Sequence, residues 1–193
     1  MLIYLHGFRS SPRSAKASLL AERMRTLGRA ADFVCPQLPP SPFAALELLK
    51  KLAPQPRDTL VGSSLGGFYA TWLAEKTGAR CVLLNPAVDP ADGLQRYVGV
   101  QKMFHSDEPF EFKDEHVAEL RALTVGAITF PARYFLIAAK GDELLDWRDM
   151  VAHYPGARHK VLEGSDHGLA DFPDYLDEVL EFAGVLPGRG TAA

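Results

Sequence analysis

The 193-residue chain has only two cysteines, Cys35 and Cys81, and no long apolar run. Each cysteine lies in a strand-like segment, where a free thiol usually serves as a small core residue, so we expect no disulfide framework. No Cys/His spacing suggests a metal site, and we expect neither metal nor cofactor. No stretch is long enough to span a bilayer and no basic region precedes the first apolar run, so we expect a cytoplasmic protein without a membrane segment.

A basic surface is also missing. The chain has 21 Lys and Arg against 24 Asp and Glu, a formal net charge of −3, and no Lys/Arg cluster stands out. We therefore expect neither nucleic acid nor an anionic membrane as a partner, and small molecules remain the expected ligands. The sequence indicates no oligomeric state.

The length and a hydrophobic content of 47% suffice for one domain with a sizeable core, which we expect over residues 1–186. A Pro/Gly-rich end at 187–193 favours a disordered tail. Short apolar strands alternate with helical patterns, which predicts βαβ units and a parallel sheet. Strands are expected near 2–6, 32–36, 58–63, 80–84, 133–139 and 159–163, and helices near 14–27, 42–53, 65–77, 147–152 and 173–183. Ser14 is expected to cap the first helix, with Leu19, Leu20, Met24 and Leu27 as its apolar stripe.

The sequence around Ser64 carries the strongest chemical signal. Ser64 is the centre of Gly62-x-Ser64-x-Gly66, which follows a strand-like run and precedes a helix-like one. Such a strand-to-helix turn holds a serine Oγ above a sheet as a nucleophile, and the first helical N–H, that of Leu65, becomes a donor for an oxyanion. Ser63 is the alternative nucleophile, but a shift of one residue on the turn points its side chain away.

An acid and a histidine follow in the order that this chemistry needs. Asp142 comes just after the strand expected at 133–139, and His167 just after the strand expected at 159–163. Loops at the carboxyl ends of parallel strands converge, so Ser64, His167 and Asp142 are expected to form a triad of nucleophile, general base and orienting acid. Asp146 is the alternative acid, although its position favours capping the helix at 147–152.

The loop after the first strand predicts a second oxyanion donor. The chain reads Leu5-His6-Gly7-Phe8 there, and the N–H of Phe8 is the expected donor. His6 is expected to hold the loop in shape, because His167 already occupies the position of the base.

Long matched segments resemble the YqiA-like esterases of the α/β-hydrolase superfamily. They are the opening from Tyr4 to Ala17, Pro36 to Pro40, Gly62 to Leu73, Asn85 to Val88, and Gly141 to Asp146. The resemblance implies a small bacterial esterase or thioesterase whose triad matches Ser64, Asp142 and His167. Asp166 departs from the Asn that commonly precedes the histidine in this family.

The superfamily fold implies a minimal α/β-hydrolase with a mostly parallel six-stranded sheet in the order 2-1-3-4-5-6, helices on both faces, and a small cap inserted at about 87–129. Within the cap, low periodicity followed by a helical pattern near Glu115 to Leu123 predicts a loop plus one helix. The cap aromatics and methionine can line an acyl pocket or merely anchor the cap to the sheet, and the sequence favours neither role. These residues are Tyr97, Met103, Phe104, Phe110 and Phe112. His105 and His116 are expected to be structural or solvated rather than in contact with substrate.

Together these features predict a cofactor-free serine hydrolase that cleaves small carboxylic esters or acyl thioesters through an acyl-enzyme. The alternatives are an acyltransferase that uses the same triad and a non-catalytic binding protein on a hydrolase scaffold.

Overall fold

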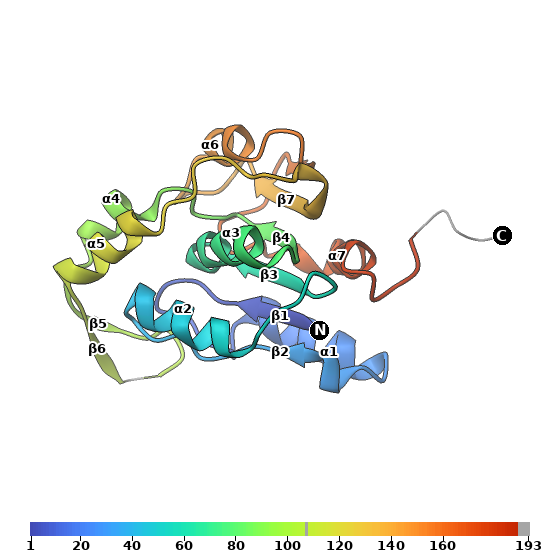
Figure 1. Ribbon diagram of the computed structural model, residues 1–193, viewed down its shortest axis with the longest axis horizontal. Helices are drawn as coiled ribbons and strands as arrows, with labels where there is room; N and C mark the ends of the chain where they lie inside the picture. The colour runs from blue at the N-terminus through green and yellow to red at the C-terminus, as the bar shows by residue number, and fades with distance from the viewer. Residues whose placement is uncertain (107, 189–193) are drawn as a thin grey trace.

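The computed structural model describes residues 1–106 and 108–188, and its centre is a six-stranded sheet (Figure 1). The strand order is β2-β1-β3-β4-β7-β8, and every neighbouring pair is parallel. The strands β5 and β6 intervene in the chain and form a separate hairpin, so the numbering of the main sheet skips them. The six strands are β1 (Leu2–Leu5), β2 (Phe33–Val34), β3 (Thr59–Ser63), β4 (Arg80–Leu84), β7 (Tyr134–Ala139) and β8 (Arg158–Leu162).

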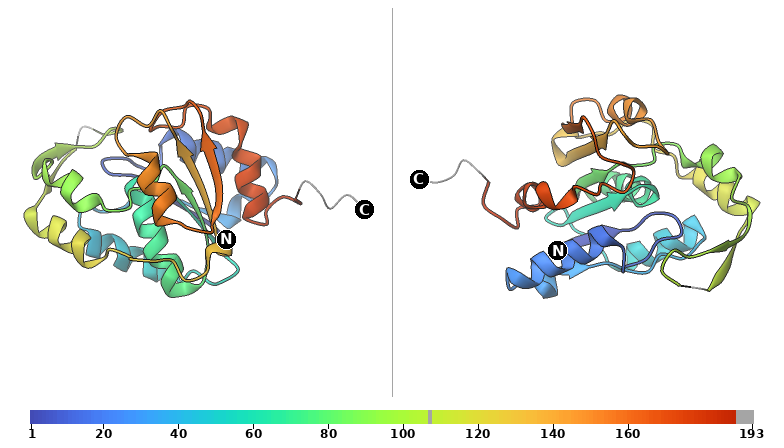
Figure 2. Two further views of the ribbon diagram at one scale, coloured as in Figure 1. Left: turned by 90° about the horizontal axis from the view of Figure 1, so that it is seen from above. Right: turned by 180° about the vertical axis from the view of Figure 1, so that it is seen from behind.

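Helices cover both faces of this sheet, as Figure 2 shows from above. Successive strand residues point to opposite faces, so Ile3 and Leu5 join one core while Leu2 and Tyr4 join the other. The first core is closed by α2 (Pro42–Lys51), α3 (Leu65–Thr77) and α6 (Trp147–His153), and the second by α1 (Ala15–Thr26) and α7 (Leu176–Phe182). Short 3-10 helices occupy Ala30–Asp32, Pro131–Arg133 and Phe172–Asp174.

Two details of the helices differ from expectation. In α1 the buried face consists of Ala17, Leu20 and Met24, whereas Leu19 is exposed, so its assignment to the apolar stripe is wrong. The last helix begins at Leu176 rather than near 173, because a 3-10 turn containing Pro173 precedes it. Most of the tail expected at 187–193 lies outside the described residues, since the description ends at 188.

The cap contains more structure than the loop and single helix expected. It consists of α4 (Pro90–Gln95), β5 (Gly99–Lys102), β6 (Pro109–Phe112) and α5 (Asp114–Ala122). The hairpin strands pair antiparallel over only four residues each, too short to give a clear alternation of apolar and polar side chains. The cap lies at the left of Figure 1, at the carboxyl ends of the main strands.

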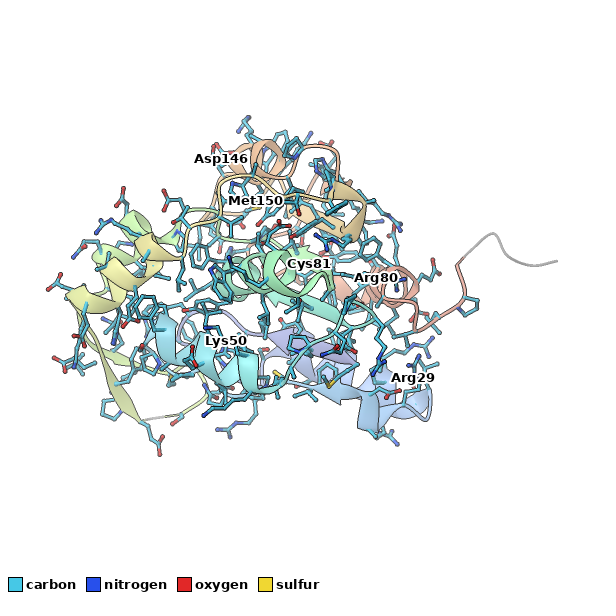
Figure 3. All side chains as sticks on the ribbon, in the orientation of Figure 1. Arg29, Lys50, Arg80, Cys81, Asp146 and Met150 are labelled. Atoms are coloured by element: carbon cyan, nitrogen blue, oxygen red, sulfur yellow. The ribbon has the colours of Figure 1, made fainter. Side chains whose placement is uncertain are left out.

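Neither cysteine is in a disulfide: Cys35 is half-buried and Cys81 is buried in the middle of the sheet (Figure 3). Of the helices within the described ranges, none combines the length and apolarity that crossing a bilayer requires.

Candidate active site

The turn between β3 and α3 holds Ser64 in a strained conformation. Ser64 is the N-cap of α3 with φ 54° and ψ −122°, a region that non-glycine residues rarely occupy. A Cβ on Gly66 would lie 1.9 Å from the carbonyl oxygen of Leu5, and a Cβ on Gly62 would lie 2.4 Å from that of Gly66. Because backbone atoms fill these positions, only glycine fits at 66 against the end of β1 and at 62 against the first turn of α3. The turn is further fixed by the Ser64 N–H, which donates to the carbonyl of Leu84 at 3.1 Å.

Asp142 and His167 meet as the sequence predicts. His167 Nδ1 lies 2.8 Å from Asp142 Oδ2 and 3.0 Å from Oδ1, and the carboxylate is fully buried. Asp142 Oδ1 also accepts hydrogen bonds from the N–H groups of Leu144 and Leu145, both at 2.9 Å. These donors fix the orientation of the carboxylate, so the imidazole carries its proton on Nδ1 and leaves Nε2 free to accept one.

Asn85, at the end of β4, joins the loops that carry the acid and the histidine. Its side chain is completely buried; Nδ2 donates to the carbonyls of Asp166 (3.0 Å) and His167 (3.2 Å), and Oδ1 accepts from the N–H of Ala139 (2.8 Å). Asn85 adopts φ 43°, which asparagine tolerates better than most residues. The sequence gives no local sign of this role, because the bonded partners of Asn85 lie more than 50 positions away.

Glu143 and Lys16 were also missed, and both contact the histidine loop. Glu143 Oε2 accepts from the His167 N–H at 3.0 Å, and Lys16 Nζ donates to the carbonyl of Gly168. Asp166, the departure from the family pattern, accepts from the Ala170 N–H at 3.1 Å and so closes the turn after the histidine.

The two expected oxyanion donors are unpaired. Among the described residues, neither the N–H of Leu65 nor that of Phe8 finds a hydrogen-bond acceptor. Leu65 opens α3, where the N–H groups of the first turn have no partner within the helix, and Phe8 follows β1. Gly7 approaches Ser64 closely: a Cβ built on Gly7 would lie 3.2 Å from the Cβ of Ser64. The loop that carries Phe8 therefore lies against the serine.

A cavity of about 450 Å³ opens between the main sheet and the cap, and Ser64 and His167 both line it. The two side chains share this wall without a mutual hydrogen bond among those found in residues 1–106 and 108–188. Such contacts are often long in a free enzyme and tighten when substrate binds. Ser63 also borders the cavity, but it is the last residue of β3, whereas Ser64 occupies the turn itself.

The cap residues divide between the two roles that the sequence left open. Tyr97 and Phe104 line the cavity with Ser64, whereas Met103 and Phe110 line a neighbouring cavity of only about 30 Å³. Phe112 lines neither: it is 1% exposed and packs on the Phe8 ring at a centroid distance of 5.0 Å, so of the two roles it takes that of anchoring the cap. Its position at the end of β6 turns the ring into the core rather than toward the cavity.

The alternatives considered for His6 and Asp146 are structural. His6 is 3% exposed; its Nδ1 bonds the Gly7 carbonyl at 2.9 Å and its Nε2 accepts from Leu38 N–H at 3.0 Å. Burial lowers the pKa of this imidazole, which favours the neutral form that these contacts require. Asp146 caps α6 by accepting from the Arg148 N–H, at the start of that helix (Figure 3).

The remaining histidines also differ in their surroundings. His116 is buried in the cap, where its Nδ1 accepts from the Lys113 N–H, whereas His105 borders the main cavity. Within the described ranges, no three His, Cys, Asp or Glu side chains gather as a protein metal site would require.

Comparison with known sequences assigns the family. The model described as "Uncharacterised protein family (UPF0227)" matches residues 1–184. This chain belongs to the UPF0227 family. A UPF0227 protein of Shewanella baltica (strain OS195) is 30% identical over an alignment of 128 residues; the alignment covers 59% of this chain and 62% of that protein. The match therefore spans less than two thirds of the length of this UPF0227 relative.

Several solved structures with a similar fold are named as hydrolases or esterases. Alpha/beta hydrolase domain-containing protein 10 from mouse has a TM-score of 0.68 and 16% identity over 93% of this chain and 89% of its own. Est1E from Butyrivibrio proteoclasticus with ferulic acid bound has a TM-score of 0.69 and 13% identity over 93% and 86%. The esterase domain of a Rhodothermus marinus protein has a TM-score of 0.63 and 20% identity over 93% and 83%. At these identities the likeness establishes that the UPF0227 chain has the α/β-hydrolase fold.

Proposed function

We propose that this protein is a serine hydrolase that cleaves carboxylic esters or acyl thioesters through an acyl-enzyme. The observation that carries the proposal is the hydrogen bond between the buried Asp142 carboxylate and His167. His167 lines the same cavity as Ser64, which lies on a strained turn. A serine hydroxyl is a weak nucleophile until a neighbouring base accepts its proton, and an oriented imidazole is the usual base.

In the proposed reaction, Ser64 Oγ attacks the carbonyl carbon while His167 Nε2 takes the hydroxyl proton. The carbonyl oxygen becomes an oxyanion, to which the unpaired N–H groups of Phe8 and Leu65 can donate. Collapse of this intermediate breaks the bond to the alcohol or thiol, and His167 returns the proton to that leaving group. Water then attacks the acyl-enzyme by the same steps, which releases the acid and restores Ser64.

Asp142 acts through the histidine. Its carboxylate fixes the imidazole tautomer and stabilises the imidazolium that forms when the serine is deprotonated. The two backbone N–H groups that bond Asp142 Oδ1 help to hold the carboxylate against His167 during these proton transfers.

The apolar wall of the cavity, which includes Leu65, Leu94 and Tyr97, supports an acyl group as the substrate portion bound there. Kinetics with p-nitrophenyl esters of graded chain length measure how far this wall extends. We expect turnover of short esters by the native protein and its loss in Ser64→Ala at unchanged thermal stability. Equal turnover by folded Ser64→Ala would refute the proposal.

Product analysis distinguishes water from another acceptor. We expect stoichiometric release of free carboxylic acid without any added alcohol or thiol. Consumption of ester only when an acceptor is present would instead identify an acyltransferase.

A further inference from the structure

The main cavity is lined by more cations than carboxylates. The cavity is lined by the cations Arg9, Lys16 and Arg96, against a single carboxylate, that of Asp89. The chain has no Asp or Glu before Glu22, although Arg9, Arg13 and Lys16 lie in that stretch. The wall contributed by residues 9–16 therefore has no acid of its own, in a protein whose net charge is −3.

These cations are not neutralised by salt bridges. In the described part of the chain, no carboxylate comes within 4.0 Å of Arg9, Lys16 or Arg96, although most other ion pairs of the molecule close at under 3.0 Å. Arg9 donates to the Lys102 carbonyl at 2.7 Å and lies over the Phe104 ring, and Arg96 lies over the Tyr97 ring. Lys16 donates to the neutral carbonyl of Gly168. An ammonium with several donors thus retains capacity for an anion.

Lys16 is the cation that is most removed from water. Burial lowers the pKa of its ammonium to about 8, against the attraction of the carboxylates of Asp166 and Asp142. A charge that has lost hydration without gaining a close counter-ion is stabilised when an anion arrives.

The start of α1 adds two further features to the same wall. Ser14 is the N-cap, yet its side chain makes no cap hydrogen bond; its Oγ is buried and interacts with the Tyr4 hydroxyl, without a hydrogen bond of normal geometry among the described residues. In α2, by contrast, the N-cap Ser41 accepts from the Ala44 N–H as expected. The first turn of α1 also lacks an acidic residue, so the positive end of the helix dipole is not compensated there. Ser14, Ala15 and Lys16 all line the cavity.

We propose that Lys16 and Ser14 form a binding site for a carboxylate carried by the alcohol portion of the ester, so that the preferred substrates of the proposed hydrolase have an anionic leaving group. We place the carboxylate on the alcohol portion because Lys16 contacts Gly168, the residue directly after His167. In the proposed reaction His167 protonates the leaving alcohol, so Lys16 lies on the side of the leaving group. One ammonium and one hydroxyl suit a compact, singly charged carboxylate. The inference rests on the proposed function only for the claim that the carboxylate belongs to the alcohol portion of the ester rather than to its acyl portion.

The kinetic test uses two butyryl esters that differ by one charge. One is the butyryl ester of 4-hydroxybenzoate, which is anionic, and the other is the butyryl ester of methyl 4-hydroxybenzoate, which is neutral. For each protein the measured quantity is the ratio of kcat/KM for the anionic ester to kcat/KM for the neutral ester. Comparing this ratio between proteins cancels the intrinsic reactivities of the two leaving groups. A charge-assisted hydrogen bond is worth about tenfold to a hundredfold in affinity, so we expect Lys16→Met to lower the ratio by roughly that factor. Lys16→Arg is expected to restore part of it.

Lys76→Met is the matched control, because it removes the same charge from an exposed site on α3 that lies outside the cavity. A ratio that falls equally in Lys16→Met and Lys76→Met, or that stays within twofold of the native value in both, would overturn the site. A preference for mono-p-nitrophenyl glutarate over its methyl ester that depends on Lys16 would also overturn it, because the carboxylate would then be bound on the acyl side.

Binding without turnover separates this inference from the proposed function. In the Ser64→Ala background we expect calorimetry to find 4-hydroxybenzoate bound more tightly than methyl 4-hydroxybenzoate, with the preference lost on adding Lys16→Met. If the native protein hydrolyses no ester and this preference is present, the carboxylate site stands and the hydrolase proposal fails. If esters are hydrolysed and the preference is absent, the hydrolase proposal stands and the carboxylate site fails.

Discussion

Replacing Asn85 tests how the triad loops are held together. Asn85→Ala removes three hydrogen bonds at a site with no solvent exposure; it leaves the His167 carbonyl and the Ala139 N–H without these partners, whereas the Asp166 carbonyl keeps its bond from the Leu169 N–H. Each net hydrogen bond is worth about 1 kcal/mol. An alanine held at φ 43° costs about 1 kcal/mol more than asparagine. We therefore expect the free energy of unfolding to fall by about 4 kcal/mol, measured by urea denaturation.

Asn85→Asp separates positioning from folding, because it keeps the acceptor for the Ala139 N–H and places an oxygen against the carbonyls of Asp166 and His167. We expect kcat to fall about a hundredfold with little change in KM, since displacement of the histidine by about 1 Å is enough for such a loss. Thr71→Val is the control: it removes a buried hydroxyl that bonds Gly67 and Tyr154, and should lower stability while kcat is retained. The reasoning is refuted if Asn85→Ala loses less than about 1 kcal/mol, or if Asn85→Asp retains native kcat.

Three further predictions concern the site and its support. Gly66→Ala places a Cβ against the Leu5 backbone, so we expect thermal denaturation to show a loss of about 3 kcal/mol or more, while Gly126→Ala, which meets nothing within 4 Å, changes little. Asp142→Asn should lower kcat by about 10⁴ through the wrong imidazole tautomer, whereas Asp146→Asn, at the cap of α6, should leave kcat near native; equal losses would reassign the acid. The preference for the carboxylate-bearing ester should decline as pH rises through about 8, because Lys16 is protonated below its pKa of about 8 and neutral above it. The charged groups that act on Lys16 are the carboxylates of Asp166 and Asp142. A preference that stays constant from pH 7 to 9.5 would count against the site.

The main sheet could be predicted from sequence because its strands are continuous apolar runs with clear helices between them. Tyr134–Ala139, for example, is buried at all six positions, which a half-exposed strand would not allow. Each expected strand lies within about two residues of its position in the structure, and so does α3, whose start is fixed by the turn at Ser64.

The cap was harder because its elements are short and its side chains are ambiguous. The sequence shows that Phe104, Phe110 and Phe112 are apolar, but not which way each ring points. In the structure Phe104 faces the cavity, whereas Phe112 packs into the core beside Phe8. Side-chain direction in a four-residue strand depends on the register with its partner, and no short-range signal fixed that register.

The site divides in a similar way. Ser64, Asp142 and His167 could be selected because each has a distinctive residue type at a strand end. Asn85 also follows a strand, but its role depends on hydrogen bonds to residues more than 50 positions away. Such contacts can be recognised only when the fold brings the carboxyl ends of β4, β7 and β8 to the same edge of the sheet.

Reaction of the folded protein with a fluorophosphonate probe, followed by intact-mass analysis and peptide mapping, tests the activated serine most directly. The account predicts a single adduct on Ser64, absent from Ser64→Ala and formed more slowly in Asp142→Asn. Folded native protein that remains unlabelled, or an adduct that persists in Ser64→Ala, would contradict it.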